Sequence, residues 1–122
     1  MSKRILVVED QHDNRQILRD LLGSVGYSLI EAENGEAAVA LAAEHKPDLI
    51  LMDIQLPIMD GYEATRRIKS DPALSAIPII VITSYALSGD EAKARAAGCD
   101  AYVTKPYSPR QLLAAVRNYL PL

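Results

Sequence analysis

Side chains able to bind a cation or a phosphoryl group stand at the ends of apolar runs in this sequence. Glu9 and Asp10 follow the run ILVV, Asp53 closes LILMD, Thr83 closes IIVIT, and Lys105 follows AYVT. Carboxylate oxygens are the ligands that hard divalent cations prefer, a hydroxyl donates hydrogen bonds, and an ammonium group supplies a flexible point charge. These residue types together suit metal-assisted chemistry on a phosphoryl group.

The apolar runs are typical of strands in a parallel sheet. They alternate with segments of helical periodicity, and this order predicts an α/β domain whose sheet is covered by helices on both faces. Ser28 and Glu31 interrupt the second run, which is therefore expected at an edge of the sheet. The expected strands are Arg4–Glu9, Tyr27–Ala32, Asp48–Asp53, Ile77–Thr83 and Ala101–Thr104.

Five helices are expected between and after these strands. The first carries apolar residues over 17–25, the second opens at Asn34 and ends before Pro47, and the third covers about 60–70. Two further helices start with capping-box spacing, Ser88 with Glu91 and Ser108 with Gln111. The fourth helix, 91–97, is short and rich in alanine, so we expect it to be the most weakly held.

Length and composition favour one folded domain over residues 1–122. Apolar residues make up 49% of the chain, yet no apolar stretch approaches the roughly 18 residues that span a bilayer. Because the start also lacks a signal-peptide cleavage site, no membrane association and a cytoplasmic location are expected. Cys99 is the only cysteine, so an internal disulfide is excluded, and we interpret it as a buried filler.

The charge pattern favours proteins rather than nucleic acids as partners. The formal net charge is −3, and no basic face is concentrated along the chain. The short basic group of Arg66, Arg67 and Lys69 is interpreted as a solvated helix face. Direct nucleic-acid binding is not expected.

The candidate reactive residues should meet at one edge of the sheet. In a flavodoxin-like, doubly wound (βα)5 sheet with strand order 2-1-3-4-5, the order reverses between the first and third strands, which brings Glu9, Asp10 and Asp53 together. Two such charges ~4 Å apart repel by about 4 kcal/mol at an effective dielectric near 20, so the cluster needs a cation. Mg²⁺ suits this site, and Asp53 can then act as a carboxylate nucleophile. Thr83 and Lys105 would contact the phosphoryl oxygens.

The motifs resemble the receiver domain of two-component response regulators over nearly the whole chain. VVEDQ carries the acidic pair, LILMDIQLPIMDG the acceptor Asp53, VITSYA the residue Thr83, and YVTKP the Lys105-Pro106 pair. Their order and spacing also match the family. Stand-alone receivers, of the CheY and DivK types, are nearest in length.

The resemblance implies a phosphoacceptor. Asp53 would take a phosphoryl group from a phosphohistidine of a sensor histidine kinase or a histidine phosphotransfer protein. Mg²⁺ would be held by Glu9 or water, Asp10, Asp53 and the backbone carbonyl of Gln55. In such domains Lys105 contacts the phosphoryl oxygen.

The resemblance further implies a switch. Thr83 moves toward the phosphoryl group while Tyr102 turns inward, and the surface of the fourth helix, fifth strand and fifth helix changes for a downstream protein target. The family also predicts a cis Lys105-Pro106 bond, and it places Gln55 and Tyr85 where autodephosphorylation is tuned.

We expect a single-domain response regulator, not an enzyme in the ordinary sense, because the site fills the chain and leaves no room for an output domain. It would act as a monomer or as a weak dimer that depends on phosphorylation. Alternatives are a receiver cut from a hybrid kinase or larger regulator, and a small Mg²⁺-dependent phosphatase with an aspartyl-phosphate, although the dehalogenase type needs an acid where Gln55 stands. A flavin module is disfavoured because the acids would repel the cofactor phosphate.

Overall fold

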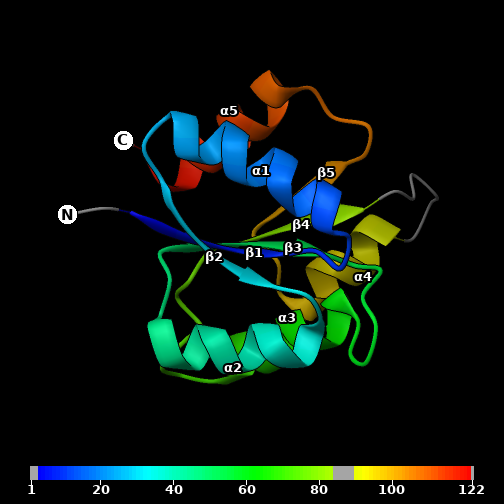
Figure 1. Cartoon of the computed structure of the whole chain (residues 1–122). Helices are drawn as coiled ribbons and strands as arrows, with labels where there is room; N and C mark the ends of the chain where they lie inside the picture. Colours follow the sequence, from blue (N-terminus) through cyan, green and yellow to red (C-terminus); the bar gives the residue numbers. More distant parts are fainter. Residues whose placement is uncertain (1–2, 84–89, 122) are drawn as a thin grey trace.

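The strands form one parallel sheet in the order β2-β1-β3-β4-β5, which confirms the predicted flavodoxin-like topology. The computed structural model describes residues 3–83 and 90–121, and Figure 1 shows the sheet between two layers of helices. The edge position predicted for the second strand is also confirmed. The strands are β1 (Arg4–Val8), β2 (Ser28–Ala32), β3 (Leu49–Asp53), β4 (Ile79–Thr83) and β5 (Ala101–Thr104).

Helices cover both faces of the sheet, as the alternating pattern predicted. In Figure 1, α1 and α5 lie on one side, and α2 and α3 lie on the other. Ala94 of α4 belongs to the same buried cluster as α2 and α3, so α4 completes that second layer. The helices are α1 (His12–Ser24), α2 (Gly35–His45), α3 (Gly61–Ser70), α4 (Asp90–Ala97) and α5 (Pro109–Tyr119).

Side-chain caps begin three of the helices. Asn34 accepts a hydrogen bond from the amide of Ala37 at 2.7 Å, and Asp60 caps α3 in the same way. Ser108 and Gln111 form both bonds of the predicted capping box. The cap predicted at Ser88 lies outside the described residues, as do the neighbouring Ser84 and Tyr85.

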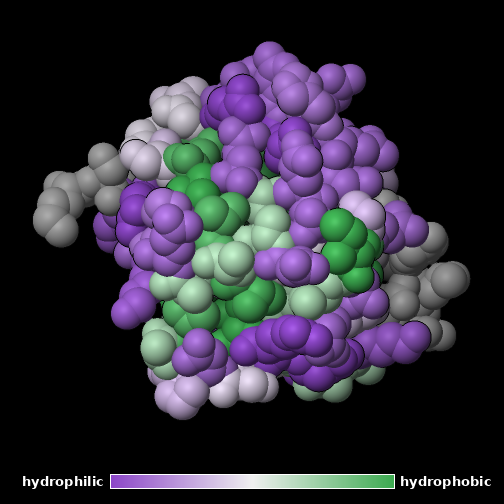
Figure 2. Space-filling model, turned by 60° about the horizontal axis from the view of Figure 1, so that its bottom comes forward, coloured by the Kyte–Doolittle hydropathy of each residue, from purple (hydrophilic) through white to green (hydrophobic). Residues whose placement is uncertain are grey.

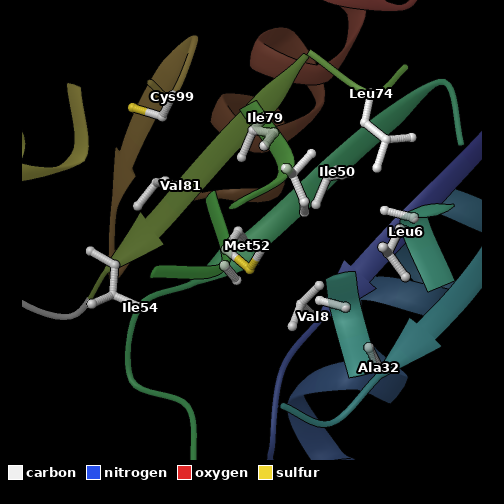
Figure 3. Packing of buried hydrophobic residues seen from close by; sticks show 14 of the residues in the cluster. Leu6, Val8, Ala32, Ile50, Met52, Ile54, Leu74, Ile79, Val81 and Cys99 are labelled. Carbon is white, nitrogen blue, oxygen red and sulfur yellow. The ribbon is translucent and has the colours of Figure 1, made fainter. Parts of the chain in front are cut away.

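Alternate residues of the strands divide the core into two layers. In β3, Ile50 and Met52 pack toward α2 and α3, whereas Leu49 and Leu51 pack toward α1 and α5. Figure 3 shows residues of the first layer, among which Val8, Met52 and Val81 lie on neighbouring strands. Cys99 is buried in this layer, as its interpretation as a filler predicted.

One face of the molecule shows the outer boundary of this layer. In Figure 2, hydrophobic residues gather in a band with polar residues on either side. The edge strand and the adjacent helix contribute half-buried residues to the same layer, namely Ile30, Ala37, Val39 and Leu41. The core is therefore only partly covered beside its edge strand.

Several predicted boundaries were wrong by one or two residues. The fourth strand starts at Ile79 instead of Ile77 because Pro78 has no amide hydrogen to donate to a neighbouring strand. Glu9 follows β1 rather than ending it, although its amide still donates to the carbonyl of Ala32 at 3.0 Å. The second and third strands each begin one residue later, at Ser28 and Leu49.

The first helix differs most from its prediction. It starts at His12, five residues before the first apolar residue of the pattern. The pattern missed this start because residues 12–16 are polar and carry no periodic signal. Ile17, which the pattern assigned to the buried face, is 60% exposed. The core contacts of α1 are made by Leu18 and Leu22 instead.

Lys69 corrects the interpretation of the basic group. Arg66 and Arg67 are exposed and pair with Glu63, but the Lys69 ammonium pairs with Asp100 at 2.8 Å and donates to two backbone carbonyls. It therefore joins α3 to the segment before β5 instead of forming a solvated face. Within residues 3–83 and 90–121, no helix has both the length and the apolar character needed to cross a membrane.

Candidate functional site

Strand register brings the predicted acids to one end of the sheet. Val8 pairs with Met52 and Asp53 pairs with Ile82, so the residue after Val8 lies beside the end of β3. Residues of β1 and β3 with odd numbers face α1 and α5, and Glu9 and Asp53 continue that alternation. The site therefore forms where these two strands end beneath α1.

The three carboxylates form one cluster. Oxygen atoms of Glu9, Asp10 and Asp53 lie within 4.8 Å of one another. Glu9 is 4% exposed and Asp53 is 5% exposed, whereas Asp10 is exposed at the rim. Burial weakens the screening that water would give, so the repulsion among these acids is greater than at an open surface.

Lys105 supplies a positive charge inside this cluster. Its ammonium lies 3.2 Å from an oxygen of Asp53 and 3.3 Å from one of Glu9. Burial on its own would lower the pKa of Lys105, but the two carboxylates outweigh it and raise that pKa. Lys105 therefore remains charged and bridges two of the acids.

Glu9 retains an unfavourable charge despite this bridge. Burial and the adjacent Asp53 raise the pKa of Glu9, while Lys105 and a hydrogen bond from the amide of Gln11 act in the opposite direction. The upward influences are the larger. A second cation beside Glu9 would therefore be stabilising.

The remaining predicted residues surround the acids to different degrees. The Thr83 side chain is fully buried at the end of β4, and its carbonyl accepts a hydrogen bond from the amide of Lys105 at 2.7 Å. The amide of Gln55 donates to Asp53 at 3.2 Å. Tyr102 is half-buried in β5 opposite Val81, on the α2 side of the sheet, and does not line the acidic hollow.

The donor set fits Mg²⁺. A polar hollow of about 340 Å³ lies above the acids and is lined by Glu9, Asp10, Gln11, Asn14, Asp53, Gln55 and Lys105. Its anionic groups are all oxygen donors, which a hard cation requires, and it has room for water ligands and a phosphoryl group. Glu9, Asp10, Asp53 and the carbonyl of Gln55 could hold the ion.

An apolar groove beside the acids was not predicted. Ile17, Leu18 and Tyr107 line it, and Glu9, Asp53 and Lys105 line it as well. Burial raises the pKa of the Tyr107 hydroxyl, which keeps this side chain neutral. The sequence carried one indication, the isoleucine at position 17 beside a turn of otherwise polar residues.

Gly61 and Arg15 also shape the site: Gly61 closes the acceptor motif LILMDIQLPIMDG, whereas no role was predicted for Arg15. A Cβ on Gly61 would overlap the carbonyl oxygen of Asp53, and the Gly61 amide donates to Ile54 at 2.9 Å. Arg15 is 7% exposed and reaches back from α1 to the backbone of Glu9. Neither contact has a local sequence signal, because each joins segments that are separate in the chain.

The fold, the acidic cluster and its lysine define a receiver domain. The family model described as the response regulator receiver domain matches residues 5–117. The chain belongs to this family, which confirms the resemblance inferred from its motifs. Receiver domains are signalling domains rather than enzymes of the ordinary kind.

Individual relatives agree with this assignment. The chain is 45% identical to the polar-differentiation response regulator DivK of Brucella anthropi, over 98% of both chains, and 44% identical to DivK of Brucella ovis. The crystal structure of a sensor histidine kinase receiver domain from Pseudomonas aeruginosa, with magnesium in its active-site cleft, is 35% identical, with a TM-score of 0.91 and 98% coverage of both chains. Chemotaxis protein CheY4 of Vibrio cholerae is 26% identical, with a TM-score of 0.92, covering 98% of this chain and 100% of that one. The protein is a DivK-like receiver domain.

Proposed function

We propose that this protein is a phosphoacceptor that takes a phosphoryl group onto Asp53 from a phosphohistidine of a sensor histidine kinase or histidine phosphotransfer protein. The observation that carries the proposal is the bridging of Asp53 by Lys105 within a group of acids. This arrangement places a nucleophilic carboxylate beside a fixed cation and a further cation site. Such surroundings suit the transfer of an anionic group.

Mg²⁺ bound to Glu9, Asp10, Asp53 and the carbonyl of Gln55 would offset the charge of the acids and of the incoming phosphoryl group. The receiver domain from Pseudomonas aeruginosa, with magnesium in its cleft, supports this choice of ion. Asp53 is held for attack by the hydrogen bond from the Gln55 amide and by Lys105.

In the transfer itself, an oxygen of Asp53 forms a bond to phosphorus as the bond from phosphorus to the donor imidazole nitrogen breaks. Lys105 then pairs with a phosphoryl oxygen, in place of its present contact with Asp53. The hydroxyl of Thr83 donates a hydrogen bond to another phosphoryl oxygen. Tyr102 turns inward at the same time. A two-state change of this kind is biased by the new contacts to the phosphoryl group.

The apolar groove gives a protein donor a place to bind. Ile17, which lines the groove, is exposed, and Asp53, the proposed acceptor, lines the same groove. Burying an apolar side chain there would hold the donor histidine near Asp53. The output face is formed by α4, β5 and α5, which would present the changed surface to a downstream protein target.

The chain would act in the cytoplasm as a single-domain regulator, either monomeric or as a weak dimer after phosphorylation. The alternative is a receiver from a hybrid kinase or a larger regulator, since one similar solved structure is a kinase receiver domain. Co-purification of the phosphorylated and of the unmodified protein with cell proteins would identify the kinase and the downstream target.

The phosphoacceptor role is tested by incubating the protein with Mg²⁺ and acetyl phosphate and following its intact mass. The wild-type protein should gain one phosphoryl group that hydroxylamine removes, and Asp53→Asn should gain none. Asp13→Asn is the matched control, because Asp13 is 97% exposed on α1. A label that persists in Asp53→Asn would overturn the assignment.

A further inference from the structure

Arg15 is the buried charged residue that contacts the backbone of the acidic loop. It is 7% exposed, and its Nη1 donates a 2.8 Å hydrogen bond to the carbonyl oxygen of Glu9. Nη2 pairs with Glu33 at 3.2 Å and Nε with Glu31 at 3.3 Å. A guanidinium has five donors in a rigid plane, so three simultaneous contacts fix its orientation.

These contacts hold the two peptide units that flank Glu9, one through its amide and the next through its carbonyl. The amide of Glu9 donates to Ala32 at 3.0 Å, and its carbonyl accepts from Arg15. The Glu9 carbonyl and the Asp10 amide share one planar peptide bond, so fixing the carbonyl also fixes the direction in which the Asp10 chain continues.

Asp10 needs such support more than the other two acids do. Glu9 and Asp53 are buried and are bridged by Lys105, whereas Asp10 is exposed at the rim of the cluster. An exposed aspartate depends on its backbone to keep its carboxylate aimed at the ion. Loss of a partner that orients a ligand typically weakens metal binding by about 10- to 100-fold.

We propose that Arg15 is a positioning residue for the Mg²⁺ site, which acts by fixing the Glu9–Asp10 peptide. The inference rests on the proposed function, since it assumes that Mg²⁺ binds these acids. Arg15 touches neither the ion nor the phosphoryl group. Its effect should therefore appear in the affinity for Mg²⁺ and in the order of the loop.

The test compares four full-length proteins by calorimetric titration with Mg²⁺: wild type, Arg15→Gln, Arg15→Lys and Arg19→Gln. Arg19 is the matched control, because it pairs with the same Glu31 from the same helix but does not bond to Glu9. Arg15→Gln should raise the dissociation constant about tenfold, and Arg15→Lys, which keeps one charged donor, should recover part of the affinity. Arg19→Gln should bind as the wild type does.

Amide hydrogen exchange without Mg²⁺ provides a second readout. The amides of Asp10 and Gln11 should exchange faster in Arg15→Gln than in the wild type, and at the wild-type rate in Arg19→Gln. The measurement is made at a temperature below the unfolding midpoint of every variant. If Arg15→Gln fails to fold, Arg15→Lys carries the comparison. Wild-type affinity in both Arg15 variants, or equal weakening in Arg19→Gln, would overturn the role of Arg15. A wild-type protein that binds no Mg²⁺ would instead overturn the proposed site itself.

Discussion

At the scale of single residues, the site holds a charge that the fold disfavours. Glu9 is buried against Asp53, and Lys105 offsets only part of the cost. A group whose pKa is higher in the folded state than in the unfolded state binds its proton more tightly when folded. Ionisation of Glu9 therefore lowers stability as the pH rises from about 4.3 toward the raised pKa, and the full cost is present above it.

Glu9→Gln should stabilise the Mg²⁺-free protein at neutral pH. The neutral amide removes the buried charge, with a gain on the order of 1 kcal/mol in the free energy of unfolding. Denaturant titration at pH 7 and at pH 4 measures it, and the gain should shrink at the lower pH because Glu9 of the wild type is then protonated. A variant less stable than the wild type at pH 7 would show that Lys105 already compensates the charge.

Some residues of the site could be predicted and others could not. Glu9, Asp10, Asp53 and Lys105 lie at the ends of apolar strands or within two residues of them, so strand order brings them together. Arg15 lies in a polar turn of helix whose partners come from other elements. Its role depends on where β2 ends relative to α1, and that distance has no signature in the neighbouring sequence.

At the scale of elements, α1 presents an exposed isoleucine beside the acids. Ile17→Gln should slow phosphoryl transfer from a phosphorylated histidine phosphotransfer protein by about tenfold, since it removes an apolar contact of up to ~1.4 kcal/mol. Labelling by acetyl phosphate, which needs no docking surface, should be unchanged. Gln16→Ala on the same helix serves as the control, and equal slowing with both donors would contradict a docking role.

The start of α3 is packed against the strand that carries the acceptor. Gly61→Ala would place a methyl group against the carbonyl of Asp53, so we expect a loss of about 3 kcal/mol or more in the free energy of unfolding, and weaker labelling of Asp53. Gly23→Ala in α1 meets no neighbouring atom, and it should instead add up to about 1 kcal/mol. Thermal unfolding of the two variants compares them directly, and equal stability would exclude the predicted overlap.

The elements themselves were largely predictable because their patterns are local. Apolar runs located the strands, and Asn34, Asp60 and Ser108 located three helix starts. The errors arose where the local sequence carries no pattern that indicates the structure. Lys69 belongs to a basic group that is typical of a solvated face. Its ammonium instead pairs with Asp100 and donates to backbone carbonyls of the segment before β4.

At the scale of the whole molecule, bound Mg²⁺ should stabilise the fold. A ligand that binds only the folded state adds about 2.7 kcal/mol when its concentration is 100 times its dissociation constant. The Tm should therefore rise steadily with Mg²⁺ in the wild type, and hardly at all in Asp10→Asn. An equal rise in both proteins would indicate that the ion binds elsewhere.

The carbonyl of Thr83 accepts a hydrogen bond from the amide of Lys105. The ammonium of this lysine pairs in turn with Glu9, near the start of the chain. The groups that would receive the phosphoryl group are thus supplied by the ends of β1, β3, β4 and β5, and they become neighbours only when these four strands have paired. A chain that is still emerging, or that has lost its last strand, lacks the lysine that holds the acceptor in place. We therefore expect a chain without β5 to be unable to accept the phosphoryl group proposed for Asp53.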